Sequence, residues 1–461
     1  MIDEIRSFIR NEAERFGAKY SKEIDKLYVE RNNTSEESLR DNGAYFGFIH
    51  QDEEATGPFH DFSLTIFPSN GTEPWLVCLG IGSNGFKNDY NLASYPGLKR
   101  LFSQLIDENG YCKSNFADIE SNLPSTFISR DDLQHIKKTI KQYSKYLPVI
   151  QIIKDPASEE SKKIISSFVA AYAKIRDWAS NKEQRNAISE ALNPFLSDKV
   201  TDHLSEVTHL LEYRKYVVLQ GPPGTGKTRL SKEISNKLNA KVFFIQFHAE
   251  TTYSDFVYGI KPNLENGDVK YLGYSGTLIN SIEYAKNNPK EKVLLIIDEI
   301  NRANLSNVLG PVFYLFEHKQ DLNNINIQLS PELSITNIPE NLFVIATMNT
   351  ADRSLAVVDF ALRRRFAWYD LYPSPIKHKD FFKEDFAEFK KIFEWYASAD
   401  ELSLQPGQGY FIADDDEQMR NRVQYELLPL VQEYLREGLL LNAKEDFNKY
   451  FLSRINKSIS Q

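Results

Sequence analysis

The stretch Gly221–Thr228, GPPGTGKT, decides the fold of this chain. It matches the phosphate-binding pattern GxxxxGK(S/T) at every position, with the apolar run YVVLQ before it and a helical sequence, TRLSKEISNKL, after it. Glycines let such a loop fold around phosphates with its N–H groups turned inward, and the helix that follows adds its positive N-terminal end. The stretch therefore predicts a nucleotide phosphate site between a buried strand and a helix.

Every position of this loop has an expected role. Lys227 should reach the β- and γ-phosphates, and the hydroxyl of Thr228 should hold Mg²⁺. The alternative is a chance match in a glycine-rich turn, and the strand and helix on either side argue against it. The residues expected to bind the nucleotide are Gly221, Pro222, Pro223, Gly224, Thr225, Gly226, Lys227 and Thr228.

A second motif lies at Val293–Asn304, VLLIIDEINRAN. Its apolar residues predict a buried parallel strand, and Asp298 stands at the carboxyl end, where open α/β sheets build their sites. We expect Asp298 to support Mg²⁺, and Glu299 to orient and activate the attacking water. The alternative is a pair of capping acids after a strand, which the complete phosphate loop disfavours.

A third motif, FVIATMNTADRS, spans Phe343–Ser354. It predicts another buried strand that ends in polar residues. Asn349 stands where a side-chain amide can hydrogen-bond the attacking water or the γ-phosphate. The alternative is an ordinary polar strand end.

A fourth motif is the basic run at Ala361–Phe366, ALRRRF. The three consecutive arginines cannot all be buried on one helical turn. An arginine supplied by a neighbouring subunit can stabilise the charge of a transferring phosphoryl group, and we assign this role to Arg364 or Arg365. The alternative is a solvated basic helix end.

Working outward from these motifs, apolar runs alternate with helical segments from residue 201 to 370, which implies a parallel α/β sheet with crossover helices. The chain then reads as helical to its end, most clearly at Gln418–Leu435 and Glu445–Ile455. The predicted organisation is a small α+β domain at 1–125, a helical linker at 126–200, a nucleotide-binding α/β domain at 201–370 and a helical lid at 371–461.

The first 125 residues combine helical and strand-like patterns. Amphipathic helices are expected at Glu4–Phe16 and Pro96–Ile106, and strands at Ala44–Ile49, Phe62–Phe67 and Trp75–Ile81.

A lysine-rich helix is expected at Asp132–Tyr146. Its lysines read as a solvated helix face rather than as a nucleic-acid contact; they are Lys137, Lys138, Lys141 and Lys145.

Composition excludes several classes of protein. The 461 residues are 41% hydrophobic and 26% charged, which is typical of globular domains. No apolar run is long enough for a membrane helix, and the acidic first residues do not form a secretion signal. Two cysteines, Cys78 and Cys112, cannot build a disulfide framework and fit a reducing compartment, so we expect a cytoplasmic protein. The net charge of −9 leaves room only for local basic patches.

The motifs together resemble the McrB family of AAA+ proteins. The resemblance rests on DEINRAN, MNTADRSLAVVD, ALRRRF and the segment QFHAETTYSDFVYGIKP at Gln246–Pro262, and it covers residues 205–435. It implies a hexameric ring that hydrolyses GTP in preference to ATP, with no nuclease of its own, and an McrC-like partner that cuts DNA. It further implies an N-terminal domain that recognises DNA, including modified DNA, and a subunit-interface role for Asp352 and Arg353.

Three features of the family cannot be carried over directly to this chain: a motif for guanine, the second-sensor arginine and the N-terminal domain. It has no NKxD guanine motif, so the base should be read around Val200–Leu211. Arg420 and Arg422 are candidate second-sensor arginines, and a plain solvated helix explains them equally well. The N-terminal domain matches no known reader of modified bases; its aromatic residues, such as Trp75, Phe46 and Tyr45, could line a base pocket or form a core.

Two other functions compete with this interpretation. A MoxR-like ATPase that remodels proteins would share the nucleotide site, but the run MNTADRS argues against it. A module that binds nucleotide without hydrolysing it is disfavoured by the intact Glu299 and Asn349.

Overall fold

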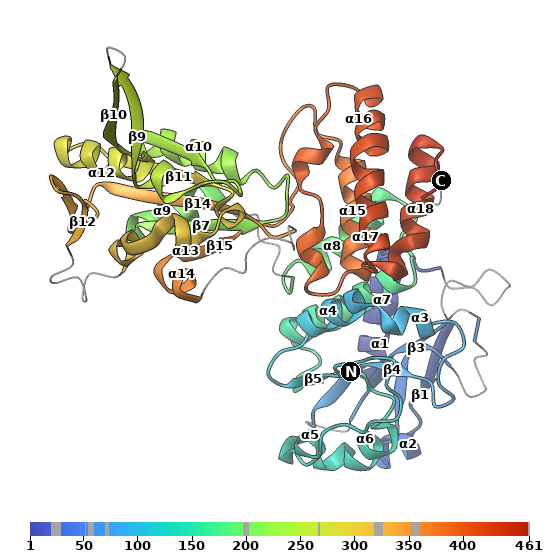
Figure 1. The fold of residues 1–461 in the computed structure, drawn as a ribbon. Coiled ribbons are helices and arrows are strands. Elements are labelled where there is room, and N and C mark those ends of the chain that lie inside the picture. Colours follow the sequence, from blue (N-terminus) through green and yellow to red (C-terminus); the bar gives the residue numbers. More distant parts are fainter. Residues whose placement is uncertain are drawn as a thin grey trace. The chain divides into compact units, whose positions relative to one another are not determined.

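The computed structural model describes residues 1–19, 29–50, 52–53, 60–69, 73–196, 202–265, 268–317, 326–351 and 360–459. The chain forms two compact units, which are described separately (Figure 1). Unit 1 comprises Met1–Val200 with Trp395–Ser398, and unit 2 comprises Thr201–Glu394 with Ala399–Gln461.

Unit 1 is built on a six-stranded sheet in the order β1-β2-β3-β4-β6-β5, with every neighbouring pair antiparallel. The strands expected at Phe62–Phe67 and Trp75–Ile81 are confirmed as β3 and β4 with the same bounds. The other strands are β1 (Val29–Asn33), β2 (Tyr45–Ile49), β5 (Gly110–Cys112) and β6 (Val149–Ile153).

Helices cover both faces of this sheet (Figure 1). On one face, the main core lies between the sheet and four helices: α1 (Ile2–Arg15), α4 (Pro96–Gln104), α7 (Glu159–Ile175) and α8 (Lys182–Leu192). On the other face, a smaller core lies between the sheet and α5 (Ser125–Ile128), the 3₁₀ turn Asp131–Ile136 and α6 (Lys137–Tyr143). Two short helices, α2 (Glu36–Arg40) and α3 (Tyr90–Ser94), belong to the connections.

The sequence pattern suggested a helical linker at residues 126–200, but the structure shows that this region is not purely helical. These residues contribute β6, which pairs with both β4 and β5, and α7, whose Phe168 and Tyr172 are fully buried in the main core. The run VIQII is short, and a short apolar run is ambiguous between strand and helix without knowledge of its pairing partners.

Unit 2 contains a five-stranded parallel sheet in the order β15-β7-β14-β11-β8. This confirms the α/β class expected from the alternating pattern. The strands are β7 (Tyr216–Gly221), β8 (Lys241–Gln246), β11 (Val293–Asp298), β14 (Leu342–Asn349) and β15 (Ala367–Asp370).

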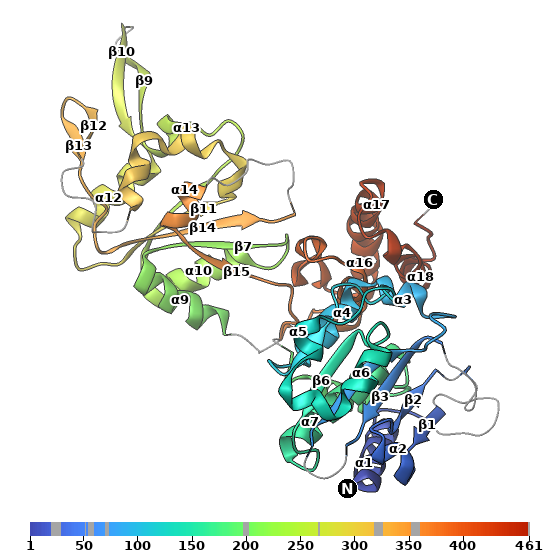
Figure 2. The same ribbon diagram turned by 90° about the horizontal axis from the view of Figure 1, so that it is seen from below.

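The two faces of this sheet bury alternate residues of the same strands. Figure 2 shows helices on both sides of the sheet. One face packs against α9 (His203–Arg214) and α10 (Lys227–Leu238). The opposite face packs against α12 (Thr277–Asn287), α13 (Leu305–Leu309) and the 3₁₀ turn Gly310–Phe316. Burial on both faces explains why the inner strands β7, β11 and β14 are continuous apolar runs, whereas the edge strand β8 is largely exposed.

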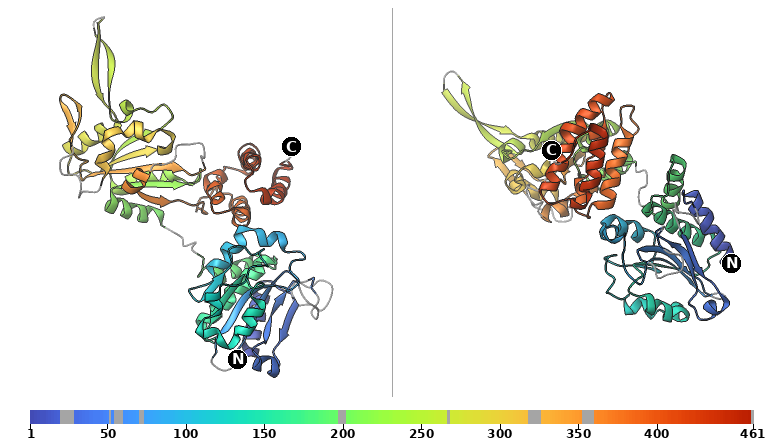
Figure 3. Two further views of the ribbon diagram at one scale, coloured as in Figure 1. Left: turned by 60° about the horizontal axis from the view of Figure 1, so that its bottom comes forward. Right: turned by 90° about the vertical axis from the view of Figure 1, so that its right-hand side faces the viewer.

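Two hairpins extend from the sheet domain, and Figure 3 shows the longer one standing clear of it. The longer hairpin consists of β9 (Tyr258–Glu265) and β10 (Asp268–Ser275), and it follows the short helix α11 (Tyr253–Phe256). The shorter hairpin consists of β12 (Ile327–Ser330) and β13 (Leu333–Ile335).

The C-terminal part of unit 2 is helical, as expected. Its helices lie side by side in Figures 1 and 3 and pack around Phe389, whose ring contacts Phe411, Phe447 and Phe451. They are α15 (Lys383–Tyr396), α16 (Asp416–Arg422), a π turn at Val423–Leu427, α17 (Leu428–Arg436) and α18 (Lys444–Ile455). Among the described helices, none has both the length and the apolar character needed to cross a membrane.

Candidate functional site

The strand order of unit 2 brings three of the predicted motifs to one edge of the sheet. Strand β14 lies between β7 and β11, so the carboxyl ends of all three are adjacent. Asn349 pairs in register with Gly221, and β11 ends at Asp298. Gly221 and Asn349, which are 128 residues apart in the sequence, thus meet beside Asp298, where parallel sheets build their sites.

The loop between β7 and α10 has the conformation that its glycines permit. Gly224 and Gly226 have φ angles of +80° and +86°, which residues with a Cβ rarely adopt. Lys227 begins α10 and is 7% exposed. Its Nζ donates to the carbonyls of Gly221 and Pro222, both at 2.8 Å, so the ammonium group is held inside the loop.

Thr228 and Asp298 form the predicted metal-binding pair. The Thr228 hydroxyl donates to Oδ1 of Asp298 at 2.8 Å, and the Thr347 hydroxyl donates to the same oxygen at 2.6 Å. Hydroxyl and carboxylate oxygens are the ligands that Mg²⁺ prefers, so this pair fits that ion. Thr347, from the neighbouring strand, is a positioning residue that the sequence interpretation missed, although its place in the run ATMNT is a usable signal.

Glu299 is held beside this pair by three contacts. Its backbone N–H donates to the Thr347 hydroxyl at 3.1 Å, and its Oε1 accepts from Nδ2 of Asn349 at 2.5 Å. Its other carboxylate oxygen lies 3.4 Å from Nε of Arg302. The φ angle of Glu299 is +56°, an unusual backbone conformation at the end of β11. The acid and the amide assigned to water activation and γ-phosphate sensing therefore touch each other.

A segment of the helical part also contacts the phosphate loop, which the sequence interpretation did not anticipate. The backbone N–H groups of Gly407 and Gly409 donate to the carbonyls of Pro223 and Gly224 at 2.9 and 2.8 Å. A Cβ on Gly407 would lie 2.2 Å from the carbonyl carbon of Gly224, so only glycine allows this approach. The sequence QPGQG, with two glycines near one proline, is the signal that could have indicated it.

The two candidate second-sensor arginines have different surroundings. Arg422 donates to the carbonyl of Gly409 at 3.1 Å and so supports the segment that touches the phosphate loop. Arg420 is paired with Asp416 on its own helix at 2.9 Å. Of the two, Arg422 is the one that contacts the segment beside the phosphate loop.

The arginine run at the end of α14 (Phe360–Arg365) separates into a buried and an exposed part. Arg365 is 4% exposed, stacks over Phe313 at 4.0 Å and is ion-paired with Glu317. The side chain of Arg364 is 70% exposed and reaches the same carboxylate at 2.5 Å. Arg365 thus has a structural environment, whereas Arg364 lies at the surface.

Other residues that the sequence singled out are not placed at the nucleotide site by the structure. Asp352 and Arg353 fall outside the described residues, as does Val200. Leu211 is fully buried within α9, so it is not exposed to a base. The two cysteines differ in their surroundings: Cys78 is fully buried, whereas Cys112 is partly buried. Burial raises the pKa of the Cys112 thiol to about 11.

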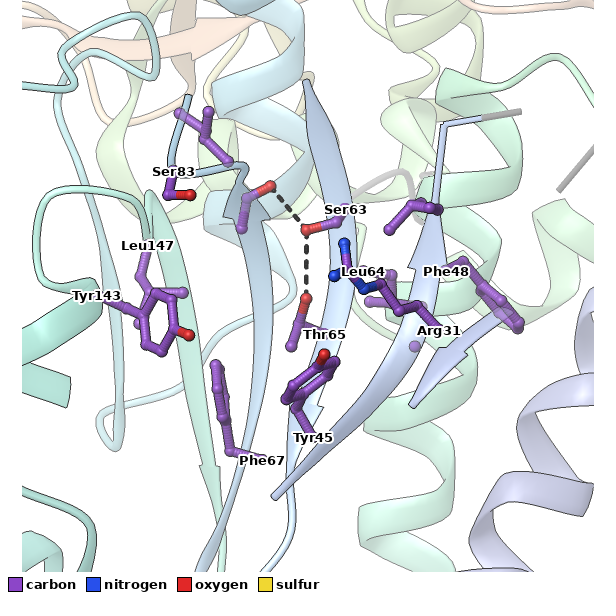
Figure 4. Close-up of a pocket in the computed structure, with 14 residues that line it drawn as sticks. Arg31, Tyr45, Phe48, Ser63, Leu64, Thr65, Phe67, Ser83, Tyr143 and Leu147 are labelled. Carbon is purple, nitrogen blue, oxygen red and sulfur yellow. Dashed lines mark hydrogen bonds between the residues drawn. The ribbon is translucent and has the colours of Figure 1, made fainter. Parts of the chain in front are cut away.

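Of the three aromatics suggested for a base pocket, two belong to the core. Phe46 and Trp75 are at most 1% exposed and contact each other edge to face at 6.1 Å. Tyr45 precedes Phe46 in β2, and alternation along a strand places it on the opposite face of the sheet. Phe46 and Trp75 are therefore excluded as pocket residues, and Tyr45 lines a cavity of about 160 Å³ on the sheet of unit 1 (Figure 4).

Comparisons with known proteins agree with this geometry. Residues 216–366 match the AAA domain family of the dynein-related subfamily. The chain is 38% identical over 201 residues to the type IV methyl-directed restriction enzyme EcoKMcrB subunit of Escherichia coli K12, a stretch covering 42% of each chain. It is 28% identical over 189 residues to the type II restriction enzyme BsuMI component YdiS of Bacillus subtilis, covering 33% of this chain and 55% of that protein.

The aligned regions span about half the length of these relatives. A solved RuvB mutant structure from Thermotoga maritima shares 20% identity, with a TM-score of 0.23 over 41% of this chain and 48% of the other. The phosphate loop, the acids Asp298 and Glu299 at the end of β11, and Asn349 at the end of β14 all fall within the matched AAA region. Residues 216–366 are therefore an AAA domain, and around this nucleotide-binding region the chain is similar to the restriction-enzyme subunit of Escherichia coli.

Proposed function

We propose that this chain is the nucleotide-hydrolysing motor subunit of a restriction complex that recognises DNA. It binds GTP in preference to ATP, with Mg²⁺, and works as a ring, with six subunits as in the family that it resembles. A separate McrC-like nuclease subunit makes the cut. The observation that carries the proposal is the contact between Glu299 and Asn349 beside the Thr228–Asp298 pair, in a region 38% identical to a restriction-enzyme subunit.

The residues divide the work of hydrolysis as follows. Lys227 and the loop N–H groups bind the phosphates, and Thr228 with Asp298 would hold Mg²⁺, which supplies charge neutralisation at the phosphates. Glu299 accepts a proton from the attacking water, and Asn349 holds this carboxylate in place. Arg364, exposed at the end of α14, would complete the site of a neighbouring subunit.

The proposal is tested by phosphate release from the purified chain with GTP and with ATP, alone and with the product of the neighbouring gene. Faster turnover with GTP, stimulated by the partner, supports the proposal. ATP preference without any effect of the partner would instead favour a protein-remodelling ATPase of the MoxR type. Light scattering with a non-hydrolysable analogue measures whether a ring forms.

The catalytic assignment has its own test. We expect Glu299→Gln to lower turnover by about 100-fold or more, because a neutral amide cannot accept the proton from water. Binding of a fluorescent GTP analogue should persist, since the phosphate loop is intact. Glu283→Gln, on the exposed surface of α12, is the matched control and should keep full activity. Full turnover in Glu299→Gln would overturn the assignment.

A further inference from the structure

The segment 407–409 of the helical part of unit 2 donates three hydrogen bonds to the phosphate loop. Two of them come from backbone N–H groups of glycines, as described above. The third comes from the side chain of Gln408, whose Nε2 donates to the carbonyl oxygen of Thr225 at 2.8 Å. The acceptors are three consecutive carbonyl oxygens of the loop, those of Pro223, Gly224 and Thr225. Three neighbouring residues therefore hold three neighbouring peptide groups of the loop.

The direction of these hydrogen bonds suits a loop that binds phosphate. In a trans peptide group the N–H and the C=O point in opposite directions, so an N–H turned toward a phosphate leaves its carbonyl facing away. Those carbonyls need donors from the protein wherever water is excluded, and Thr225 is only 5% exposed. The segment 407–409 supplies the donors, and it thereby fixes the direction in which the loop N–H groups face.

Small residues on both sides make this contact possible. A Cβ on Gly409 would lie 3.0 Å from the carbonyl oxygen of Gly224. A Cβ on Gly224 would in turn lie 2.8 Å from Cδ2 of Tyr410. Because the two backbones approach this closely, the side chain of Gln408 is long enough to form a direct hydrogen bond with the loop.

Gln408 uses both ends of its amide. Its Oε1 accepts from the backbone N–H of Ser374 at 3.4 Å, in the chain that leads from β15 to the helical part. A second contact between the helical part and the nucleotide site lies close by in the sequence. The hydroxyl of Thr350, which follows Asn349, donates to the carbonyl of Ser403 at 3.3 Å. The side chain of Gln408 thus joins the phosphate loop to the connection between the sheet and the helices.

We propose that Gln408 is a positioning residue for nucleotide phosphates, and that it acts through the peptide groups of the phosphate loop. Its amide holds the loop N–H groups in the direction of the phosphates before a nucleotide binds, which removes part of the ordering cost of binding. Linkage requires the reverse effect as well: bound phosphates stabilise the contact between the loop and the segment 407–409. The inference rests on the nucleotide binding proposed above, and it holds for GTP and ATP alike.

The test compares Gln408→Leu with a matched control. Gln408→Leu removes the donor and keeps a side chain of similar size. We expect KM for GTP or ATP, and the Kd of their non-hydrolysable analogues, to increase about fivefold through the loss of one hydrogen bond, while kcat changes by less than about twofold. In the control, Gln432→Leu removes a similar hydrogen bond, from Nε2 to the carbonyl of Ile459 at 2.9 Å, and should leave KM unchanged.

A second measurement needs no variant. Hydrogen exchange at the backbone N–H groups of Gly407 and Gly409 should slow about fivefold when a non-hydrolysable analogue binds with Mg²⁺, because bound phosphates stabilise their acceptors. Exchange in α18 (Lys444–Ile455) is the reference and should not change. In Gln408→Leu the slowing should be smaller than in the unchanged chain. Gln408 is partly exposed, and calorimetric unfolding confirms that its variant folds.

The outcomes separate this inference from the proposed function. Unchanged KM and Kd in Gln408→Leu would overturn the positioning role and leave hydrolysis at the loop intact. Equal increases in Gln408→Leu and Gln432→Leu would indicate a general loosening of the helical part, and would also overturn it. Exchange at Gly407 and Gly409 that ignores a bound analogue would contradict the linkage. Failure of the unchanged chain to bind either analogue would overturn both proposals.

Discussion

The nucleotide site of unit 2 and the cavity of unit 1 are built in opposite ways. In the first, charged groups already have partners: Lys227 donates to carbonyls of its own loop, and Asn349 donates to Glu299. In the second, Gly80 leaves room beside the hydroxyls of the buried Ser63 and the partly exposed Thr65. A site for phosphates needs charges and N–H groups near each other in the sequence, whereas a cavity needs an empty volume that several strands must shape together.

The variant with the largest expected effect disrupts the nucleotide site of unit 2 and leaves unit 1 unchanged. Lys227→Ala should lower nucleotide hydrolysis by about 100- to 1000-fold, because this variant lacks the preorganised cation next to the transferring phosphate. Phosphate release measures the decrease, and Lys232→Ala, exposed on the same helix, should have no such effect. The unfolding temperature of unit 1 should be unchanged; a decrease would mean that the two regions are not independent.

The second-largest expected effect is a loss of stability of unit 1 when Gly47 is replaced. A Cβ on Gly47 would lie 1.8 Å from the carbonyl oxygen of Leu64 in the adjacent strand. We expect Gly47→Ala to destabilise unit 1 by about 3 kcal/mol and to lower its unfolding temperature by about 10 °C. Scanning calorimetry measures the shift. Gly43→Ala, whose nearest neighbour would be 4.0 Å away, should cost far less, and equal shifts would refute the steric argument.

A third comparison separates two adjacent arginines of unit 2. Arg365→Ala leaves the largely buried Glu317 without its buried partner, and should lower the free energy of unfolding by about 3 kcal/mol. Arg364→Ala removes an exposed ion pair and should change it by less than about 1 kcal/mol. Urea unfolding measures both values. Similar decreases in the two variants would contradict the division into a structural and a surface arginine.

The smallest expected effect concerns the exposed lysines of α6. Lys138→Ala and Lys141→Ala should each weaken binding to DNA duplexes of any sequence to a similar, small extent. Each should also reduce the slope of log K against log salt concentration by about one for every DNA phosphate that the variant no longer neutralises. Anisotropy titrations at several salt concentrations measure this slope. A change confined to one duplex sequence would instead indicate that these lysines contact bases.

Much of the nucleotide site was predictable from sequence. The loop Gly221–Thr228 and the strands that end at Asp298 and Asn349 are continuous local patterns, and the unbroken apolar runs of the strands indicate buried parallel strands. The role of Thr347 and the approach of Gly407 to the loop were not predicted, because both depend on contacts between segments distant in the sequence. In unit 1, β6 was missed for the same reason: the run VIQII becomes a strand by pairing with β4 and β5.

The sequence by itself determined the chemistry of the phosphate loop, since eight consecutive residues contain the glycines, the lysine and the threonine that the loop requires. Only the tertiary structure decided which arginine is buried, which aromatic residues belong to the core and where a cavity opens. Phe46 and Tyr45 are neighbours in the chain, yet one is in the core and the other lines the cavity. The physical reason is that burial and empty volume depend on how strands pair and what covers each face of the sheet.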